Sequence, residues 1–206
     1  MLSRLDIANL ALGKLGVSLT ITDYANDISN QAKVIRRHFK MALELLLEKH
    51  PWNFATKYGA LTLVSEDAKQ PYRYLYSVPA DCLIIREIAD EERFTDVERY
   101  EDYKIRWEQV YEAAGAIRIR TNLVDAWAKY TVAVDETYSF PSHFGRALAA
   151  QLALEIAPSL ITNNFPKIKA TLASEVMSEV NEGIADDMGR QPRRLESYSP
   201  FVLARH

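Results

Sequence analysis

Apolar residues in the first quarter of the chain recur with the period of an α-helix in two stretches. The first opens at Ser3, which begins a capping-box pattern, and ends before Gly16; the second stops at Pro51. Residues three or four apart lie on one helix face, and proline disfavours helical geometry in the residue before it. The pattern therefore predicts helices over about residues 3–15 and 29–49.

The pattern changes in the middle of the chain, where short segments rich in β-branched and aromatic residues are bounded by proline or aspartate. Segments of this kind are typical of β-strands. They lie at residues 60–64, 72–76, 83–88, 117–120 and 126–134. Residues 98–112 fit a helix as well as a strand, but Ala113-Ala114-Gly115 is typical of a hairpin turn, so we expect a strand near the end of this stretch.

Helical periodicity returns after Pro141, with one dense apolar stretch before Pro158 and a second stripe over about residues 166–187. The elements together predict an α+β protein that is mainly α: an antiparallel helical bundle of about four helices, with a small antiparallel β insert and an extended C-terminal tail. The predicted boundaries are 1–56 and 138–188 for the bundle, 57–137 for the β-rich insert and 189–206 for the tail.

Charge separates the tail from the rest of the chain. Residues 189–206 hold four arginines and one glutamate, for +3, so the net charge of −3 leaves −6 on residues 1–188. No apolar run approaches the ~18 residues that a membrane span needs, and the first residues lack the order of a signal peptide. The lone cysteine, Cys82, excludes an intrachain disulfide. We expect synthesis in the cytoplasm and no membrane partner.

Candidate chemistry is sparse. The histidines His38, His50, His143 and His206 are widely spaced, and the seven glycines occur singly, so we expect no metal site, no phosphate-binding loop and no cofactor. Ser142 and His143 are adjacent at a predicted helix start, which does not suit a nucleophile and its base. We therefore expect no catalytic residues and no enzyme activity, although two carboxylates from distant segments could still form a hydrolase site.

Three segments of the sequence carry a resemblance to a known family. The first combines Ile7–Gly16 with His50–Ala55, the second is Tyr72–Leu83, and the third is Phe140–Ala157. In these segments and their order, over most of residues 5–160, the chain resembles the podoviral tail-adaptor family, also called tail tubular protein A or head-to-tail connector proteins. The motif residues with an expected structural role are Trp52, Phe54, Tyr74, Tyr76, Pro79, Asp81, Cys82, Pro141 and Phe144.

The resemblance implies a structural virion protein located in the phage tail at the portal vertex and made in the host cytoplasm. It implies a homo-oligomeric ring of twelve copies, with the portal protein on one side and the tail nozzle, a tail tubular protein B-like protein, on the other. The genome would pass through the centre without specific binding. Tail fibres are a further candidate partner.

The tail is the segment that we expect to recognise the portal. Arginines can make bidentate contacts with acidic groups, and a cluster of aromatic and aliphatic residues can fill a groove on a partner. The expected portal-binding residues are Arg190, Arg193, Arg194, Tyr198, Phe201, Val202 and Leu203.

A nucleic-acid-binding module remains an alternative function. It would use the aromatic residues of the β insert as stacking platforms and the arginines of the tail as phosphate contacts. Its affinity for DNA would fall steeply with salt, whereas an adaptor would show little affinity at physiological salt.

Overall fold

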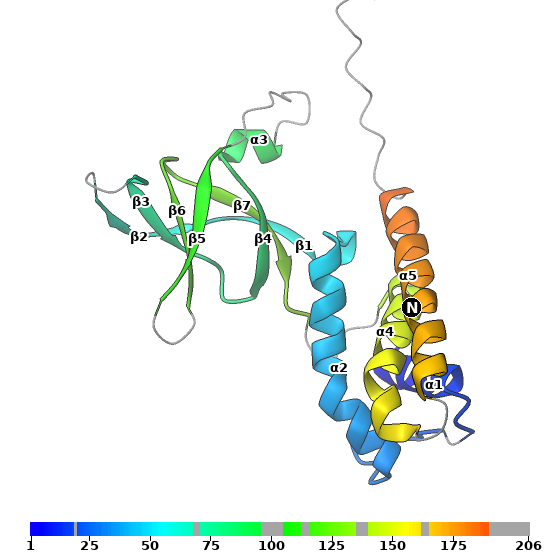
Figure 1. Ribbon diagram of the computed structural model, residues 1–206. Helices are drawn as coiled ribbons and strands as arrows, with labels where there is room; N and C mark the ends of the chain where they lie inside the picture. The colour runs from blue at the N-terminus through cyan, green and yellow to red at the C-terminus, as the bar shows by residue number, and fades with distance from the viewer. Residues whose placement is uncertain are drawn as a thin grey trace, which may run out of the picture.

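The computed structural model describes residues 1–18, 20–67, 71–95, 105–112, 116–134, 140–161 and 165–189. Helices and strands separate into two parts that lie side by side (Figure 1). The helical module contains α1 (Arg4–Lys14), α2 (Asn30–Lys49), α4 (Ser142–Leu160) and α5 (Phe165–Gly189). The β module contains β1 (Thr56–Ala60), β2 (Thr62–Glu66), β3 (Tyr74–Ser77), β4 (Cys82–Ala89), α3 (Glu91–Thr95), β5 (Trp107–Tyr111), β6 (Ile117–Thr121) and β7 (Trp127–Val132).

The predicted fold class, a mainly α helical bundle with a small β insert, is wrong. The described residues contain seven strands in two antiparallel sheets, and the composition of 49 % helix and 25 % strand is that of an α+β fold. The β module is a second layer of structure with its own buried residues, not an appendage. The size of the sheets was underestimated because strand pairing joins segments that are distant in sequence and leaves no local periodic signal.

The first two helices begin where their sequences place capping residues. Ser3 accepts a hydrogen bond from the Asp6 amide (3.2 Å), and its own amide donates to the Asp6 carboxylate (2.9 Å), which completes the capping box of α1. Ser29 caps α2 through the Ala32 amide (3.3 Å). The buried stripe of α2 then repeats every three or four residues from Ala32 to Leu47, as its apolar pattern predicts.

Helix α4 is the centre of the helical module, since α1, α2 and α5 all pack against it. Its alanine-rich sequence allows close approach from several sides, and most of its residues are buried. The helix continues through Pro158 to Leu160. The residue after it still closes a helical turn, because the Ile161 amide donates to the Ala157 carbonyl (2.9 Å).

The β module is built from a three-stranded sheet in the order β1-β7-β4 and a four-stranded sheet in the order β2-β3-β6-β5. The sequence pattern predicts one strand over 60–64, but the chain forms two strands that meet at Leu61. The Leu61 amide donates to the Ala126 carbonyl (2.8 Å), so the chain passes from one sheet to the other at this residue. β2 is exposed along its whole length at the edge of its sheet.

The buried side chains form one cluster that runs from the helices into both sheets. The N-terminal residues join it, because Leu2 and Phe140 exchange two backbone hydrogen bonds (2.8 and 2.9 Å) and the Leu2 side chain packs on Gly145 of α4. None of the helices in the described part of the chain is long and apolar enough to cross a membrane.

Candidate functional site: the motif residues and the junction of the two modules

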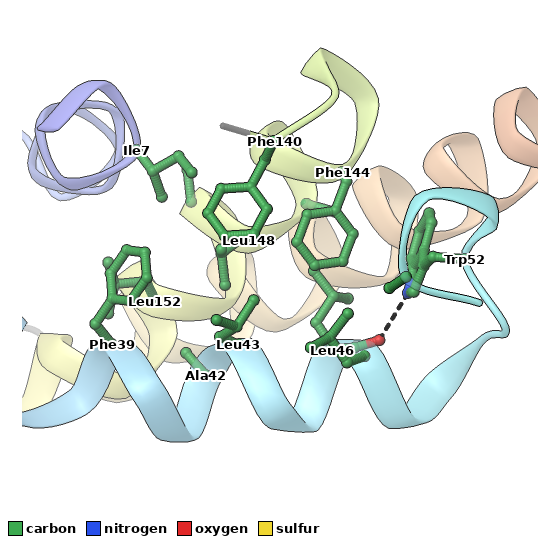
Figure 2. Close-up of a cluster of buried hydrophobic side chains, with 14 of the residues drawn as sticks. Ile7, Phe39, Ala42, Leu43, Leu46, Trp52, Phe140, Phe144, Leu148 and Leu152 are labelled. Carbon is green, nitrogen blue, oxygen red and sulfur yellow. Dashed lines mark hydrogen bonds between the residues drawn. The ribbon is translucent and has the colours of Figure 1, made fainter. Parts of the chain in front are cut away.

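Four aromatic side chains of the first and third motif segments meet where the helical module joins the β module. Phe144, on the first turn of α4, packs edge-to-face on Trp52 (4.9 Å between ring centroids) and on Phe54 (4.7 Å). Phe140 stacks on Phe144 at 5.4 Å (Figure 2). Aromatic pairs in these geometries stabilise a core beyond the area they bury. The segments that carry the resemblance therefore form a packing centre.

Trp52 is fully buried and is oriented by a hydrogen bond. Its indole N–H donates to the Leu46 carbonyl in the last turns of α2 (2.9 Å), drawn as the dashed line in Figure 2. Proline at position 51 ends the helix, and the chain then turns so that the Trp52 ring packs back against it. This turn directs the chain from α2 into β1.

Asp187, in the last turn of α5, contacts the turn that follows α2. Its carboxylate accepts the Asn53 amide (3.0 Å) and lies 3.2 Å from Nε2 of His50, while the Asn53 side chain donates to the Asp187 carbonyl (2.8 Å). Asp187 is only 2 % exposed. A buried carboxylate is stable when such donors surround it. Asp187 therefore connects the end of α5 to the end of α2 through hydrogen bonds.

The adjacent residues Ser142 and His143 begin α4. His143 is buried, its Nε2 lies 3.6 Å from the Asp187 carboxylate, and neither ring nitrogen makes a hydrogen bond to a described residue. Its ring lies beside that of Trp52, 6.1 Å away. The arrangement packs the start of α4 against α5. Among the described residues, no group of three histidine, cysteine or acidic side chains is placed to hold a metal ion.

Arg86 of β4 connects the sheet to α2. Its guanidinium donates to the carbonyls of Leu47 (2.6 Å), Glu48 (2.9 Å) and His50 (3.2 Å), and to the Thr131 hydroxyl (2.9 Å). These carbonyls belong to the end of α2, where helix carbonyls lack intrahelical partners and attract cations. Burial lowers the pKa of Arg86 from its usual value. The side chain ties the β module to the helical module.

The second motif segment lies elsewhere, in the β module. Tyr74 and Tyr76 are on β3, and Tyr76 is buried with its hydroxyl donating to the Leu123 carbonyl (2.9 Å). The Cys82 amide donates to the Pro79 carbonyl (3.0 Å), which closes the turn into β4. This segment therefore shapes the connection between the two sheets.

Asp81 and Cys82 of this segment have distinct surroundings. The Asp81 carboxylate pairs with Lys57 of β1 (2.7 Å), and that hydrogen bond raises the pKa of Lys57. The Tyr130 hydroxyl lies 3.4 Å from the same carboxylate. Burial, with a smaller contribution from Asp81, raises the pKa of the Cys82 thiol to about 11. A thiol of this kind is a poor nucleophile at neutral pH.

The structure thus brings Trp52, Phe54 and Phe144 together and keeps the second segment apart from them; Pro141 is the N-cap of α4. The predicted portal-binding residues of the tail lie outside the described residues. Sequence reasoning missed Asp187 and Arg86, and no local signal marks either one, since their partners are distant in sequence.

Comparison with known proteins found no family model that matches this chain and no matching curated protein.

Proposed function

We propose that this chain is a structural subunit of a short-tailed phage virion, the adaptor that forms a ring between the portal and the tail nozzle. The observation that carries the proposal is the set of three motif segments, in the order typical of the tail-adaptor family, over most of residues 5–160. The buried contacts of Trp52, Phe54 and Phe144 support it, because motif residues of a structural subunit are expected to act in packing.

In this role the helical module supplies the body of the ring and the C-terminal segment recognises the portal. The net charge of −6 on residues 1–188 suits a channel through which DNA slides, because attraction to phosphate would slow its passage. The portal contacts are assigned to Arg190, Arg193 and Arg194 and to the apolar residues near the end of the chain. The proposed partners are the portal protein, the nozzle protein and further copies of this chain.

Light scattering on the purified chain, alone and mixed with the portal protein of the same phage, tests the proposal. We expect the full chain to bind the portal in a stoichiometric ring, and a chain ending at Met188 with the same circular dichroism spectrum not to bind. A full chain that ignores the portal would contradict the adaptor role.

Nucleic-acid binding is the alternative function. Among the aromatic side chains of the β module, Tyr76 is only 2 % exposed, so its ring is not accessible for stacking on bases, whereas Tyr58 is 51 % exposed. Titration of labelled single- and double-stranded DNA at increasing salt separates the two functions. Tight binding at physiological salt, lost steeply as salt rises, would favour the nucleic-acid module over the adaptor.

A further inference from the structure

One side of the helical module carries several exposed apolar side chains in the described part of the chain. Leu45 of α2 is 38 % exposed, and Met177 and Met188 of α5 are 68 % and 58 % exposed. Single exposed apolar residues are common on protein surfaces, whereas a contiguous set indicates a contact surface. We call this set, with Leu154 and Pro158 of α4 and Ile184 of α5, the α2–α5 face; its members are Leu45, Leu154, Pro158, Met177, Ile184 and Met188.

Helix geometry places the α2 and α4 members on the same side of the module. Leu45 precedes Lys49 by four positions, about 40° around the helix, and therefore lies on the same edge of α2. Lys49 donates to Gln151 of α4 (3.4 Å), so this edge of α2 lies beside Gln151. Leu154 and Pro158 follow Gln151 by three and seven positions, on the same strip of α4.

The α5 members lie on this side as well. Glu175 and Glu179 of α5 pair with Lys14 of α1, and Glu179 also pairs with Arg146 of α4 (3.2 Å). Met177 is two positions from each of these acids, which is about 200° around the helix. It therefore points away from α1. In Figure 1, α4 is visible between α2 and α5, the two helices that border this face.

The chain itself supplies a suitable occupant. Seventeen residues, 190–206, follow the last residue of α5, so they leave the helix beside Met188, at one end of the face. An extended chain advances about 3.3 Å per residue, so Phe201 can lie as far as about 40 Å from Gly189. Helix α5 is about 37 Å long at 1.5 Å per residue. The apolar residues of the segment can therefore reach any part of the face.

Chemistry favours the same occupant. The segment combines Tyr198 and Phe201 with two aliphatic residues, which match a face of methionine, leucine and isoleucine side chains.

We propose that in the free subunit the C-terminal segment of the same chain folds back along the α2–α5 face, with Tyr198, Phe201, Val202 and Leu203 covering it. The docking keeps the apolar face from associating with other molecules. It also makes portal binding and self-docking exclusive, because both use these four residues; this consequence, unlike the docking, rests on the proposed function.

Engineered cysteine pairs in the full chain test the docking. One variant carries Met177→Cys with Val202→Cys, and the matched control carries Glu182→Cys with Val202→Cys. Met177 and Glu182 are both exposed, but Glu182 lies on the side of α5 that faces Arg146. The native Cys82 interferes little, because its raised pKa leaves it mostly protonated at neutral pH.

Mild oxidation of dilute monomer, followed by intact-mass measurement and peptide mapping, is expected to form the disulfide within the Met177→Cys chain at least tenfold faster than within the control. Equal rates in the two variants would mean that the segment does not dock on this face, and disulfides formed only between chains would mean that its occupant is a second copy. Both results would overturn the proposal. The chain is measured alone, so the result is independent of portal binding.

Binding of the dye ANS provides a second measurement. Phe201→Ser with Leu203→Ser in the full chain should uncover the α2–α5 face and raise dye fluorescence several-fold, while Arg205→Ser should leave it unchanged. No increase in the double variant would also contradict the docking.

Discussion

At the scale of single residues, Asp187 shows how one buried carboxylate joins segments that are distant in sequence. It accepts the Asn53 amide and lies beside His50 and His143, so it fixes the end of α5 to the end of α2 and the start of α4. Its neighbour Asp186 is exposed. The two acids therefore allow a comparison in which charge and position in the helix are nearly the same.

We predict that Asp187→Asn lowers the free energy of unfolding by about 2 kcal/mol, because hydrogen bonds to a buried charged group are lost and the amide cannot replace them all. Asp186→Asn should change it by less than about 0.5 kcal/mol, as expected for an exposed position. Urea unfolding followed by circular dichroism measures both. Equal effects of the two substitutions would show that the hydrogen bonds of Asp187 contribute nothing to stability.

The Cys82 thiol provides a test of pH dependence. Its pKa is raised from 9.0 to about 11 in the folded chain, so the folded state retains the proton more tightly than the unfolded state. Stability from this group is therefore complete below pH 9 and is lost as the pH rises toward 11. At pH 8 the folded chain should hold about 100-fold less thiolate than the unfolded chain.

Alkylation with iodoacetamide at pH 8 should accordingly be at least about 100-fold slower in the native protein than in 8 M urea, because the thiolate is the reacting species. Peptide mass spectrometry over time gives both rates. An alkylation rate in the native protein close to the rate in urea would mean that the thiol is not buried and that its pKa is not raised.

At the scale of helices and strands, Arg86 should determine how firmly α2 holds the first sheet. Arg86→Met removes donors from three carbonyls at the end of α2 and should cost about 2–3 kcal/mol. Arg73→Met removes only an exposed ion pair with Glu66 and should cost less than about 1 kcal/mol. Urea unfolding gives the two values, and a similar loss in both variants would contradict the role assigned to Arg86.

The packing of α5 on the junction can be tested through glycine. A Cβ at Gly183 would lie 3.2 Å from the Trp52 ring and 3.3 Å from the His143 carbonyl, whereas a Cβ at Gly13 meets nothing within 4 Å. Gly183→Val should therefore destabilise the protein by about 1–3 kcal/mol through overpacking, and Gly13→Val by far less. Thermal unfolding of the two variants distinguishes a crowded site from an open one.

The helices were predictable because each carries a long apolar stripe and, for α1, a capping box that the structure confirms at Ser3. The division between β1 and β2 at Leu61 was not predictable, because it depends on a hydrogen bond to Ala126, a residue far along the chain. The partners of Asp187 and Arg86 were hidden for the same reason. Local patterns therefore give the helices well, but not the number of sheets or the contacts that join the modules.

At the scale of the whole molecule, the continuous buried cluster indicates that the two modules unfold together. A single-tryptophan variant that keeps Trp127 of the β module, with the other tryptophans replaced by phenylalanine, tests this. Its fluorescence midpoint in urea, which reports on the β module, should coincide with the midpoint of its circular dichroism at 222 nm, which is dominated by the helices. Midpoints that differ by more than the fitting error would show that the modules are independent units.

The central position of α4 also affects synthesis. Residues 4–49 form two helices whose apolar sides pack on a helix that begins at Ser142, so the ribosome makes all seven described strands before that partner exists. The strands are made while the first two helices still lack their neighbour, and the apolar sides of these helices stay open to chaperones until α4 leaves the exit tunnel. The order in which the chain is made therefore places the greatest risk of aggregation in its first quarter, although that part is deeply buried in the finished protein.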